Sequence, residues 1–341
     1  MRIPKVLLAA GAAGLIYAGR KALRAQRKLG FAGKIVVITG GSRGLGLALA
    51  RAFAREGARL AICARNEEQV NAAWQELGAL GAEVLPRVVD VTQAEEVTAF
   101  VREVREKWGQ IDVLVNNAGI ISAAPYNAAE AEDYEASLAT HFWATFHTVR
   151  AVVPHMRRRG AGRIVNVASI GGVAALPGMS AYAVGKFALV GYSQALRAEL
   201  TREGIYVTTV CPGLIVSGSQ VNVEIKGGQA EQLYDRFKHL NAWLGIPVEQ
   251  AAWQILEAAR YGQAMVIFPA WAKALAGLQG IAPGLVASSM AMANKLIPVA
   301  TPGAFERKTG QALETSPDTE AERKLYHAAL ANNQQAPISP V

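Results

Sequence analysis

The sequence predicts an α/β protein built on a doubly wound parallel sheet of seven strands, with one domain over residues 33–270. Three observations predict it. From residue 34 to residue 268, short runs rich in valine and isoleucine alternate with longer amphipathic segments, which indicates βαβ units with helices on both faces of a parallel sheet. A glycine-rich turn follows the first run, and 51% hydrophobic with 18% charged residues excludes a disordered chain.

The strands are predicted where β-branched residues dominate short runs. These runs are residues 34–39, 59–63, 83–89, 113–115, 163–167, 206–210 and 265–268. The helices are predicted in the longer segments between them, where apolar residues recur at helical spacing. These segments are residues 45–56, 67–80, 94–108, 132–158, 181–203 and 248–261. Outside this pattern lie an apolar and basic N-terminal helix, residues 1–30, and a C-terminal helical extension, residues 271–341.

The positive charge of the chain is concentrated at its N-terminus. The formal net charge is +8, but eight of the 35 basic residues lie between residues 2 and 34, and the first acid is Glu56. The other 27 basic residues balance the 27 acidic ones, so the body of the protein is neutral. A neutral body excludes a general polyanion-binding surface, and no nucleic-acid partner is expected.

Residues 6–19 form an uncharged stretch between two basic clusters. As a helix it would span only about 21 Å of the ~30 Å hydrocarbon core, although snorkelling lysines and arginines narrow the gap. It can be a cleaved signal peptide, a membrane anchor or in-plane helix, or a helix packed on the domain. The flanking charges favour a membrane anchor within residues 3–28, with the body of the protein facing the cytoplasm. A helix packed on the domain would leave the protein cytoplasmic.

The C-terminal extension has an apolar and a polar part. Residues 274–294 carry no charge, but four glycines and prolines interrupt them. Broken helices that lie on a membrane or on a partner subunit therefore fit better than a spanning helix. The tail after Pro302 is polar and charged, and its last residues are expected to be mobile.

The glycine-rich turn reads Thr39 to Gly46 and includes Ser42, Arg43 and Leu45. Glycines at positions 40, 44 and 46 let the backbone approach a pyrophosphate, and the following helix presents N–H groups and the positive end of its dipole. Glycine clusters also make ordinary turns. The position of this one, between a strand and a helix at the start of a βαβ series, favours nucleotide binding.

Three motifs together resemble the short-chain dehydrogenase/reductase family. They are GxxxGxG at Gly40, Gly44 and Gly46, the run Asn116-Asn117-Ala118-Gly119, and Tyr182 four residues before Lys186. The resemblance covers about residues 33–270 and keeps the family's order. It implies a Rossmann-like fold, a nicotinamide cofactor, an oxidoreductase acting on CH–OH groups, and possible homo-oligomers.

The end of the second strand indicates which cofactor is used. An acid there binds the ribose 2′-hydroxyl of NAD, but this strand ends Cys63-Ala64-Arg65-Asn66. Arg65 can pair with a 2′-phosphate, and Arg43 adds a second cation on the same side. Either arginine alone can be a solvated surface residue. Together, with the acid missing, they predict NADP(H).

The resemblance implies further cofactor contacts. It places Asp90 and Val91 beside the adenine, and Asn117, Ala118 and Gly119 along its ribose. It places a second set beside the nicotinamide: Pro212, Gly213, Ile215 and Ser217, with Tyr182 and Lys186. Two of these sites also have a structural role: Asp90 can cap a helix that begins near residue 92, and residues 212–217 form the turn that ends a strand. Neither structural role excludes the cofactor contact.

Ser169, Tyr182 and Lys186 are the predicted reacting groups. Tyr182 and Lys186 share one helix face, where the ammonium is expected to lower the tyrosine pKa from ~10. The resemblance places Ser169, thirteen residues before Tyr182, on the substrate oxygen. In reduction, Tyr182 protonates that oxygen as hydride reaches the carbonyl carbon, and Lys186 binds the nicotinamide ribose.

His141 departs from the family pattern. The family commonly has an asparagine at this position of the preceding helix, where it supports a water relay behind the lysine. Imidazole can hold a water and exchange a proton near its pKa, so His141 is a candidate for this relay. A buried histidine satisfied by a backbone carbonyl is the alternative. Tyr192 and Ser193, out of register with Tyr182, are interpreted as packing or surface residues.

These residues predict an NADP(H)-dependent alcohol dehydrogenase or carbonyl reductase. One alternative is a catalytically silent NADP(H)-binding scaffold or sensor at the membrane, and the intact catalytic set argues against it. Another is a membrane-tethered interaction protein whose apolar C-terminal segment is the functional part. Residues 218–245 are expected to cover the substrate. With the apolar residues 274–294 they indicate a lipophilic alcohol or ketone, unless they pack against the core or a partner subunit. The apolar side chains concerned are Val221, Val223, Ile225, Leu233, Phe237, Leu240 and Trp243.

The remaining chemistry-bearing residues predict no further site. Cys63 and Cys211 cannot form a disulfide framework and fit a reducing compartment. Cys211 is interpreted as a small core residue because no base or second cysteine lies near it in the sequence. No clustered spacing of histidine, cysteine and carboxylate indicates a metal site.

Overall fold

The computed structural model describes residues 25–227, 230–295, 306–313 and 320–332. The proposed anchor at residues 6–19 and the last residues of the tail lie outside these ranges. Among the helices that are described, none combines the length and the apolar character needed to cross a bilayer.

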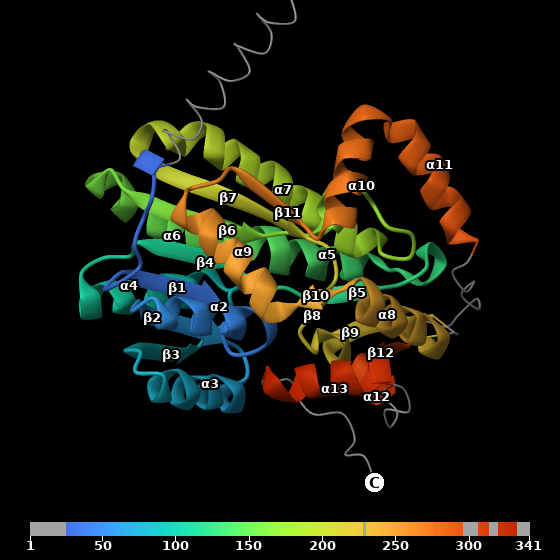
Figure 1. The fold of residues 1–341 in the computed structure, drawn as a ribbon, viewed down its shortest axis with the longest axis horizontal. Helices are drawn as coiled ribbons and strands as arrows, with labels where there is room; N and C mark the ends of the chain where they lie inside the picture. The colour runs from blue at the N-terminus through green and yellow to red at the C-terminus, as the bar shows by residue number, and fades with distance from the viewer. Residues whose placement is uncertain (1–24, 228–229, 296–305, 314–319, 333–341) are drawn as a thin grey trace, which may run out of the picture.

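A seven-stranded parallel sheet forms the centre of the fold, as predicted (Figure 1). Its order is β11-β7-β6-β4-β1-β2-β3. The strands are β1 Ile35–Thr39, β2 Arg59–Ala64, β3 Val84–Val88, β4 Val113–Asn116, β6 Gly162–Val167, β7 Ile205–Pro212 and β11 Met265–Phe268. The chain runs outward from β1 to β3 and then returns to place β4 on the other side of β1. Ligands of open α/β sheets bind at such a switch point, at the carboxyl ends of the strands.

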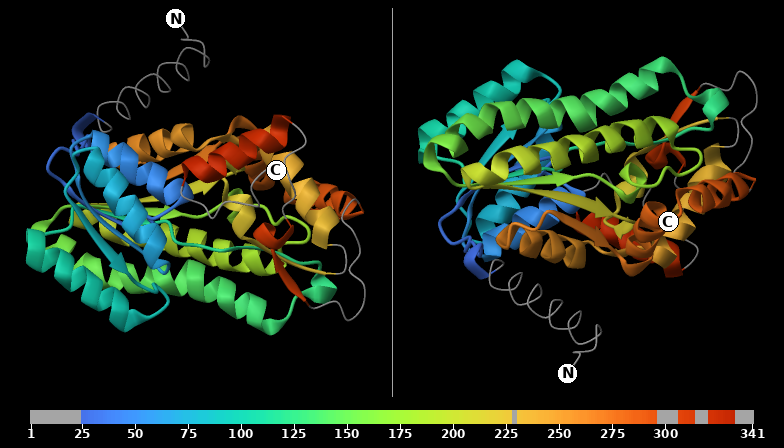
Figure 2. Two further views of the ribbon diagram at one scale, coloured as in Figure 1. Left: turned by 90° about the horizontal axis from the view of Figure 1, so that it is seen from below. Right: turned by 90° about the horizontal axis from the view of Figure 1, so that it is seen from above.

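Helices cover both faces of this sheet (Figure 2). One face carries α2 Gly44–Arg55, α3 Glu67–Ala79 and α9 Val248–Arg260, and the other carries α4 Ala94–Trp108, α6 Ala144–Arg159 and α7 Ser180–Leu200. Along β1, Val36 and Ile38 face the first group of helices, and Ile35 and Val37 face the second. Burial on both faces explains why the strands read as continuous apolar runs.

The predicted helix over residues 132–158 is wrong in one respect, because it is interrupted. It consists of α5 Ala131–Leu138, a π-helical turn η2 Ala139–Trp143, and α6. The apolar periodicity of the sequence continues through the wide turn, so it gives no sign of the break. The turn contains His141, whose side chain is 1% exposed. Single π-turns inside helices often occur at functional sites.

Two small sheets and the C-terminal segment complete the molecule. A three-stranded sheet contains β5 Ile121–Ala123, β9 Val223–Lys226 and β12 Arg307–Thr309, and a pair contains β8 Ile215–Val216 and β10 Ile246–Pro247. Helices α8 Ala230–Leu244, α12 Gly310–Leu313 and α13 Glu320–Ala331 lie beside them. Part of the expected polar tail is therefore a strand and two helices. Short helical turns are η1 Tyr126–Ala128, η3 Ile170–Gly172, η4 Thr201–Glu203 and η5 Ser219–Asn222.

The apolar extension is broken into two helices, as the sequence predicts. Helix α10 Ala270–Ile281 and helix α11 Pro283–Asn294 form a hairpin that projects from the body (Figure 1). Pro283 begins α11, a position where its missing N–H costs no helical hydrogen bond. Ile281 is 87% exposed and Met292 is 68% exposed. That this hairpin contacts a membrane or a partner stays a prediction.

Candidate active site

The glycine-rich turn between β1 and α2 is tied to the end of β4. The Thr39 hydroxyl accepts hydrogen bonds from the backbone N–H groups of Asn117 at 3.0 Å and Ala118 at 3.1 Å. The Asn117 amide donates to the carbonyl oxygens of Thr39 at 3.2 Å and Gly40 at 3.1 Å. The Asn117 side chain therefore braces the turn. Thr39 has a positioning role that the motif alone did not reveal.

Two glycines of this turn cannot carry a side chain. A Cβ on Gly46 would lie 1.9 Å from the Gly40 carbonyl oxygen, and Gly40 itself has a φ of 62°, in the left-handed region. The backbone of the first turn of α2 therefore packs directly on the loop before it. This packing leaves the outer side of the turn open for an anion at the helix N-terminus.

A cleft of about 540 Å³ opens at this edge of the sheet. It brings together most of the predicted cofactor residues: Gly40, Ser42, Arg43, Gly44, Leu45, Arg65, Asp90, Val91, Asn117, Ala118 and Gly119. Its wall also contains Val221, which was expected to cover the substrate, and residues that sequence analysis missed: Ile120, Ile121, Thr140, Ser219, Asn222, Glu224, Thr309 and Gln311. Ile120 and Ile121 directly follow the motif that ends at Gly119, so the motif could have pointed to them. The others come from segments whose position depends on long-range packing.

Some predicted contacts are placed elsewhere. Pro212, Gly213, Ile215 and Ser217 do not line this cleft; Gly213 packs against Trp271, where a Cβ would lie 2.5 Å from the indole ring. Pro212 ends β7 and Ile215 lies in β8, with Gly213 and Ser217 in the adjoining turns. This strand-ending turn does not exclude contacts with the nicotinamide, which stay a prediction.

The helix-capping alternative for Asp90 is wrong. Its carboxylate accepts hydrogen bonds from the N–H of Thr92 at 2.9 Å and from the Thr92 hydroxyl at 2.8 Å. Helix α4 begins at Ala94 and is preceded by Gln93, so the Asp90 carboxylate closes a turn two residues before the helix. Asp90 still lines the cleft.

Arg43 and Arg65 lie together at one end of the cleft. Arg43 is half-buried and donates a 2.6 Å hydrogen bond to the Asn222 side-chain oxygen, across the cleft wall. Burial and the neighbouring charge of Arg65 lower the pKa of Arg43. Two cations that repel each other are stabilised by an anion bound between them, so this end of the cleft fits a phosphate group.

Ser169, Tyr182 and Lys186 meet at the carboxyl end of β6. The Ser169 hydroxyl accepts a 3.0 Å hydrogen bond from the Gly171 N–H and is hydrogen-bonded to Tyr182. The Lys186 ammonium donates to the Val167 carbonyl at 3.1 Å and lies 5.7 Å from the centre of the Tyr182 ring. The structure thus brings together the three residues that the sequence identified.

The pKa values of the pair are set by burial. Burial raises the pKa of Tyr182 to about 12, against the hydrogen bond from Ser169. Burial also lowers the pKa of Lys186 to about 7. The loss of solvation dominates the Tyr182 pKa in the protein without its cofactor, and the lowering of that pKa by the Lys186 ammonium stays a prediction. Tyr182 is a protonated acid at neutral pH.

His141 lies behind this pair. Its Nε2 is 3.1 Å from the Ile120 carbonyl and its Nδ1 is 3.2 Å from the Ser137 hydroxyl. A Cβ on Gly119 would lie 3.2 Å from His141 Nε2 and 3.6 Å from Lys186 Nζ, so both side chains face one point of the backbone. Burial and the charge of Lys186 hold the His141 pKa well below its usual value.

These contacts match the backbone-carbonyl alternative for His141. The ring is neutral at physiological pH, so it does not exchange a proton by its own ionisation there. Its role in a water relay stays a prediction.

The expected substrate cover is largely a packed core. Val221, Val223 and Ile225 are at most 1% exposed, whereas Trp243 is 81% exposed. Leu233 and Phe237 pack against the same small cluster. The packing alternative holds for Val223, Ile225, Leu233 and Phe237, whereas Val221 also lines the cofactor cleft. That the substrate is lipophilic stays a prediction.

Other candidate residues are structural. Ser193 is buried and accepts hydrogen bonds from the Asn166 amide at 3.0 Å and the Thr209 hydroxyl at 2.7 Å. Cys63 and Cys211 are buried free thiols, and burial raises the pKa of each to about 12. Within the described ranges no group of histidine, cysteine and carboxylate side chains is arranged to hold a metal.

Comparison with known proteins identifies the family. A family model described as short chain dehydrogenase matches residues 34–226, so the chain belongs to the short-chain dehydrogenase family of oxidoreductases. It is 34% identical over 223 residues to estradiol 17-beta-dehydrogenase 11 of Rattus norvegicus. The aligned region covers 64% of this chain and 75% of the rat protein.

Two solved structures share the fold. L-sorbose reductase from Gluconobacter frateurii, complexed with NADPH and L-sorbose, is 31% identical with a TM-score of 0.62, covering 71% of this chain and 97% of that one. A short chain dehydrogenase/reductase from Burkholderia phymatum, in complex with NAD, is 24% identical with a TM-score of 0.70, covering 75% and 96%. The family binds a nicotinamide cofactor, and the cleft, the glycine turn and the two arginines fit one.

Proposed function

We propose that this protein is an NADP(H)-dependent carbonyl reductase or alcohol dehydrogenase. The observation that carries the proposal is the meeting of Ser169, Tyr182 and Lys186 at the carboxyl edge of the sheet, beside a cleft that begins at a glycine-rich helix N-terminus. A scaffold that only binds a nucleotide has no use for a buried lysine beside a buried tyrosine. Burying these two ionisable groups costs solvation free energy and shifts their pKa values, and such shifts are typical of catalytic sites.

The chain's own groups supply acid catalysis and orientation. When bound, the nicotinamide cofactor supplies or accepts the hydride. The Tyr182 hydroxyl, with its pKa near 12, donates a proton to the substrate oxygen during reduction. The Ser169 hydroxyl donates a hydrogen bond to the same oxygen and stabilises its developing negative charge. Lys186 replaces the proton lost by Tyr182, and His141, hydrogen-bonded to Ile120 and Ser137, positions the backbone behind Lys186.

The choice of NADP(H) rests on Arg43 and Arg65. Both line one end of the cleft, and no acid follows β2 to bind a free ribose 2′-hydroxyl. The related L-sorbose reductase was solved with NADPH. We expect wild type to prefer NADPH over NADH in kcat/KM. Arg65→Asp should reverse that preference because an aspartate repels a 2′-phosphate and accepts from a hydroxyl. An unchanged preference would remove Arg65 from cofactor recognition.

The substrate class and the membrane attachment are proposed together. The related rat protein is named an estradiol dehydrogenase, and exposed apolar side chains lie on the α10–α11 hairpin, including Ile281, Leu285 and Met292. Both favour a lipophilic alcohol or ketone reached from a membrane surface. The basic N-terminal residues, within 1–30, would attach the catalytic domain to the cytoplasmic side. Identical fractionation of full-length and 31–341 protein with membranes would exclude this attachment.

The reaction is tested with wild-type protein and a panel of ketones and aldehydes that ranges from sugars to long acyl chains and steroids. NADPH oxidation is followed by absorbance, and products are identified by mass spectrometry. Turnover with one substrate class supports the enzyme and assigns the substrate. Tight NADPH binding with no turnover across the panel would favour a silent scaffold or sensor.

A further inference from the structure

The C-terminal segment forms part of the cofactor cleft. Strand β12 pairs with β9, and Thr309 at its end and Gln311 in helix α12 line the cleft. The family model ends at residue 226, so these two residues lie outside the part of the chain that it describes. We name residues 307–313 and 320–332 the C-terminal clasp.

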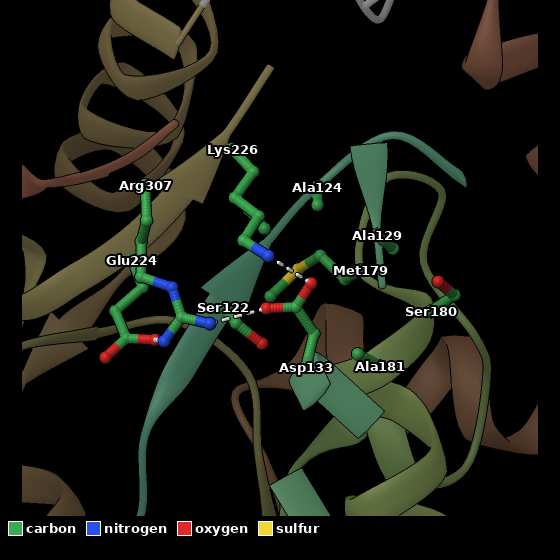
Figure 3. A pocket seen from close by; sticks show the side chains of 11 residues that line it. Ser122, Ala124, Ala129, Asp133, Met179, Ser180, Ala181, Glu224, Lys226 and Arg307 are labelled. Atoms are coloured by element: carbon green, nitrogen blue, oxygen red, sulfur yellow. Dashed lines mark hydrogen bonds and ion pairs between the residues drawn. The ribbon is translucent and has the colours of Figure 1, made fainter. Parts of the chain in front are cut away.

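A buried ion network fixes the first end of the clasp (Figure 3). Arg307 pairs with the Asp133 carboxylate at 2.7 Å and with Glu224 at 2.9 Å. Lys226 pairs with Asp133 at 2.7 Å and with Glu130 at 2.9 Å. Asp133 and Lys226 are 6% and 7% exposed. Because each buried charge has a partner, the network holds β12 in one position.

The second end of the clasp is fastened to the phosphate-binding turn itself. The Asn332 carbonyl accepts a 2.9 Å hydrogen bond from the Gly44 N–H, the first residue of α2. Arg51 lies further along α2. Its guanidinium donates to the Asn332 side-chain oxygen at 2.9 Å and to the Ala331 carbonyl at 2.7 Å. Glu76 accepts from the same guanidinium at 2.9 Å. Asn332 is 1% exposed.

Close packing holds α13 between these two ends. A Cβ on Gly218 would lie 2.1 Å from the Ala329 Cα, so the helix sits directly on that backbone. Leu325 and Ala329 are at most 2% exposed. The Gln220 amide donates to the Leu325 carbonyl at 3.4 Å. Figure 1 shows α13 next to α12 and below α8.

The contact joins two helix ends of opposite polarity. The last carbonyls of α13 carry a partial negative charge, and the first N–H groups of α2 carry a partial positive charge. A cofactor pyrophosphate would use the same end of α2. Because Asn332 takes only the Gly44 N–H, the N–H groups that follow it stay available to the phosphate. The clasp therefore supports the turn without filling it.

We propose that the C-terminal clasp holds the nicotinamide cofactor in its cleft, and that the cofactor leaves only when Asn332 separates from Gly44 and Arg51. The proposal rests on the cofactor site of the proposed function. Thr309 and Gln311 close one wall of the cleft, and the Arg43–Asn222 hydrogen bond links the turn to the segment on which α13 packs. A cofactor bound in the cleft would contact both the glycine-rich turn and the clasp residues Thr309 and Gln311.

The test measures cofactor release from the full chain by stopped-flow fluorescence, with NADPH and NADH as separate probes. Asn332→Ala removes one of the acceptors of Arg51, the Asn332 side-chain oxygen. We expect it to raise the dissociation rate about tenfold, the order of a buried charge-assisted hydrogen bond. Lys324→Ala, which removes an exposed side chain of the same helix, is the matched control and should leave the rate unchanged. Thermal unfolding confirms that both variants are folded.

Hydrogen exchange of wild type gives a second readout that needs no variant. We expect cofactor to slow exchange at residues 320–332 as well as at the turn. Equal dissociation rates in Asn332→Ala and wild type, or exchange at 320–332 that cofactor does not change, would overturn the clasp while leaving the proposed function intact. A wild-type chain that binds neither probe would overturn both.

Discussion

Tyr182 and Lys186 show how burial sets the chemistry of single side chains. The pKa of Tyr182 is raised to about 12 and the pKa of Lys186 is lowered to about 7. In each case the main cause is that burial removes water from the charged form. The protonated tyrosine is the acid that carbonyl reduction needs. The reverse reaction needs the phenolate, so the two directions should depend differently on pH.

The first prediction concerns that difference. Alcohol oxidation requires deprotonated Tyr182, so its kcat/KM should rise with pH above neutrality, about tenfold per unit where Tyr182 controls the rate. Carbonyl reduction, measured in the same buffers, should show no such rise. A rate of oxidation that stays flat between pH 7 and pH 10 would show that the Tyr182 pKa does not control the step.

The second prediction concerns the cost of burying Lys186. Its folded pKa, about 7, lies below the ~10.4 of an unfolded lysine, so between these values the unfolded chain binds more protons and the stability of the protein rises with pH. From pH 7 to pH 9, wild type should gain about 2 kcal/mol of unfolding free energy relative to Lys186→Met. Denaturant titrations at both pH values measure this. If the difference in unfolding free energy between wild type and Lys186→Met were the same at pH 7 and pH 9, Lys186 would have an ordinary pKa.

The glycine-rich turn between β1 and α2 depends on backbone packing. Gly46→Ala would place a Cβ 1.9 Å from the Gly40 oxygen and 2.6 Å from the Asn117 amide nitrogen. We expect a loss of about 1–3 kcal/mol in stability and at least tenfold weaker cofactor binding, because the turn itself must move. Gly78→Ala is the matched control: nothing lies within 4 Å of its Cβ, and in helix α3 alanine should stabilise by about 0.5–1 kcal/mol. Thermal unfolding and fluorescence titration with NADPH measure both effects, and equal behaviour of the two variants would contradict the packing argument.

The strands and the glycine turn could be predicted from sequence because their signals are local. Runs such as residues 34–39 are buried on both sides and therefore read as apolar throughout. The interruption at residues 139–143 could not be predicted, since a π-turn changes the backbone without changing the apolar spacing enough to notice. Strand β12 gives no local signal either, because Arg307-Lys308-Thr309 forms a strand only by pairing with β9 and by neutralising Asp133.

The same division holds for the candidate site. Ser169, Tyr182, Lys186 and the glycines are fixed by motif spacing. Thr309 and Gln311 reach the cleft only because distant contacts fold the C-terminal segment back, and the shift in the Tyr182 pKa depends on burial that sequence does not measure. Motifs thus identify the reacting groups, whereas packing decides their ionisation and the walls around them.

Across the molecule, the Lys226–Asp133–Arg307 network joins the C-terminal clasp to the catalytic domain. Lys226→Met would leave Asp133 buried with one partner fewer, and we expect a loss of about 3–5 kcal/mol. Lys308→Met removes an exposed pair with Glu231 on the neighbouring position of β12, and should cost under about 1 kcal/mol. Denaturant titrations of both variants make the comparison, and similar small losses would show that the network contributes little.

The network also sets a dependence on acid. Burial acts to raise the Asp133 pKa, but hydrogen bonds from the Glu130 N–H and Lys226, with the charges of Lys226 and Arg307, lower it overall. A carboxyl whose folded pKa is lowered stabilises the protein above its unfolded pKa, ~3.9, and loses that contribution as pH falls through the folded value. The clasp should therefore detach only in strong acid, and hydrogen exchange of residues 307–313 at decreasing pH would detect it.

We propose that Tyr182 is the acid of a nicotinamide-dependent carbonyl reduction. The most direct measurement is NADPH oxidation by Tyr182→Phe with the best carbonyl substrate of wild type, alongside the NADPH dissociation constant of both proteins. Removal of a general acid predicts a kcat about 10²–10⁴ times lower with NADPH binding unchanged. If Tyr182→Phe reduced the substrate at the wild-type rate, Tyr182 would not be the acid of the reaction.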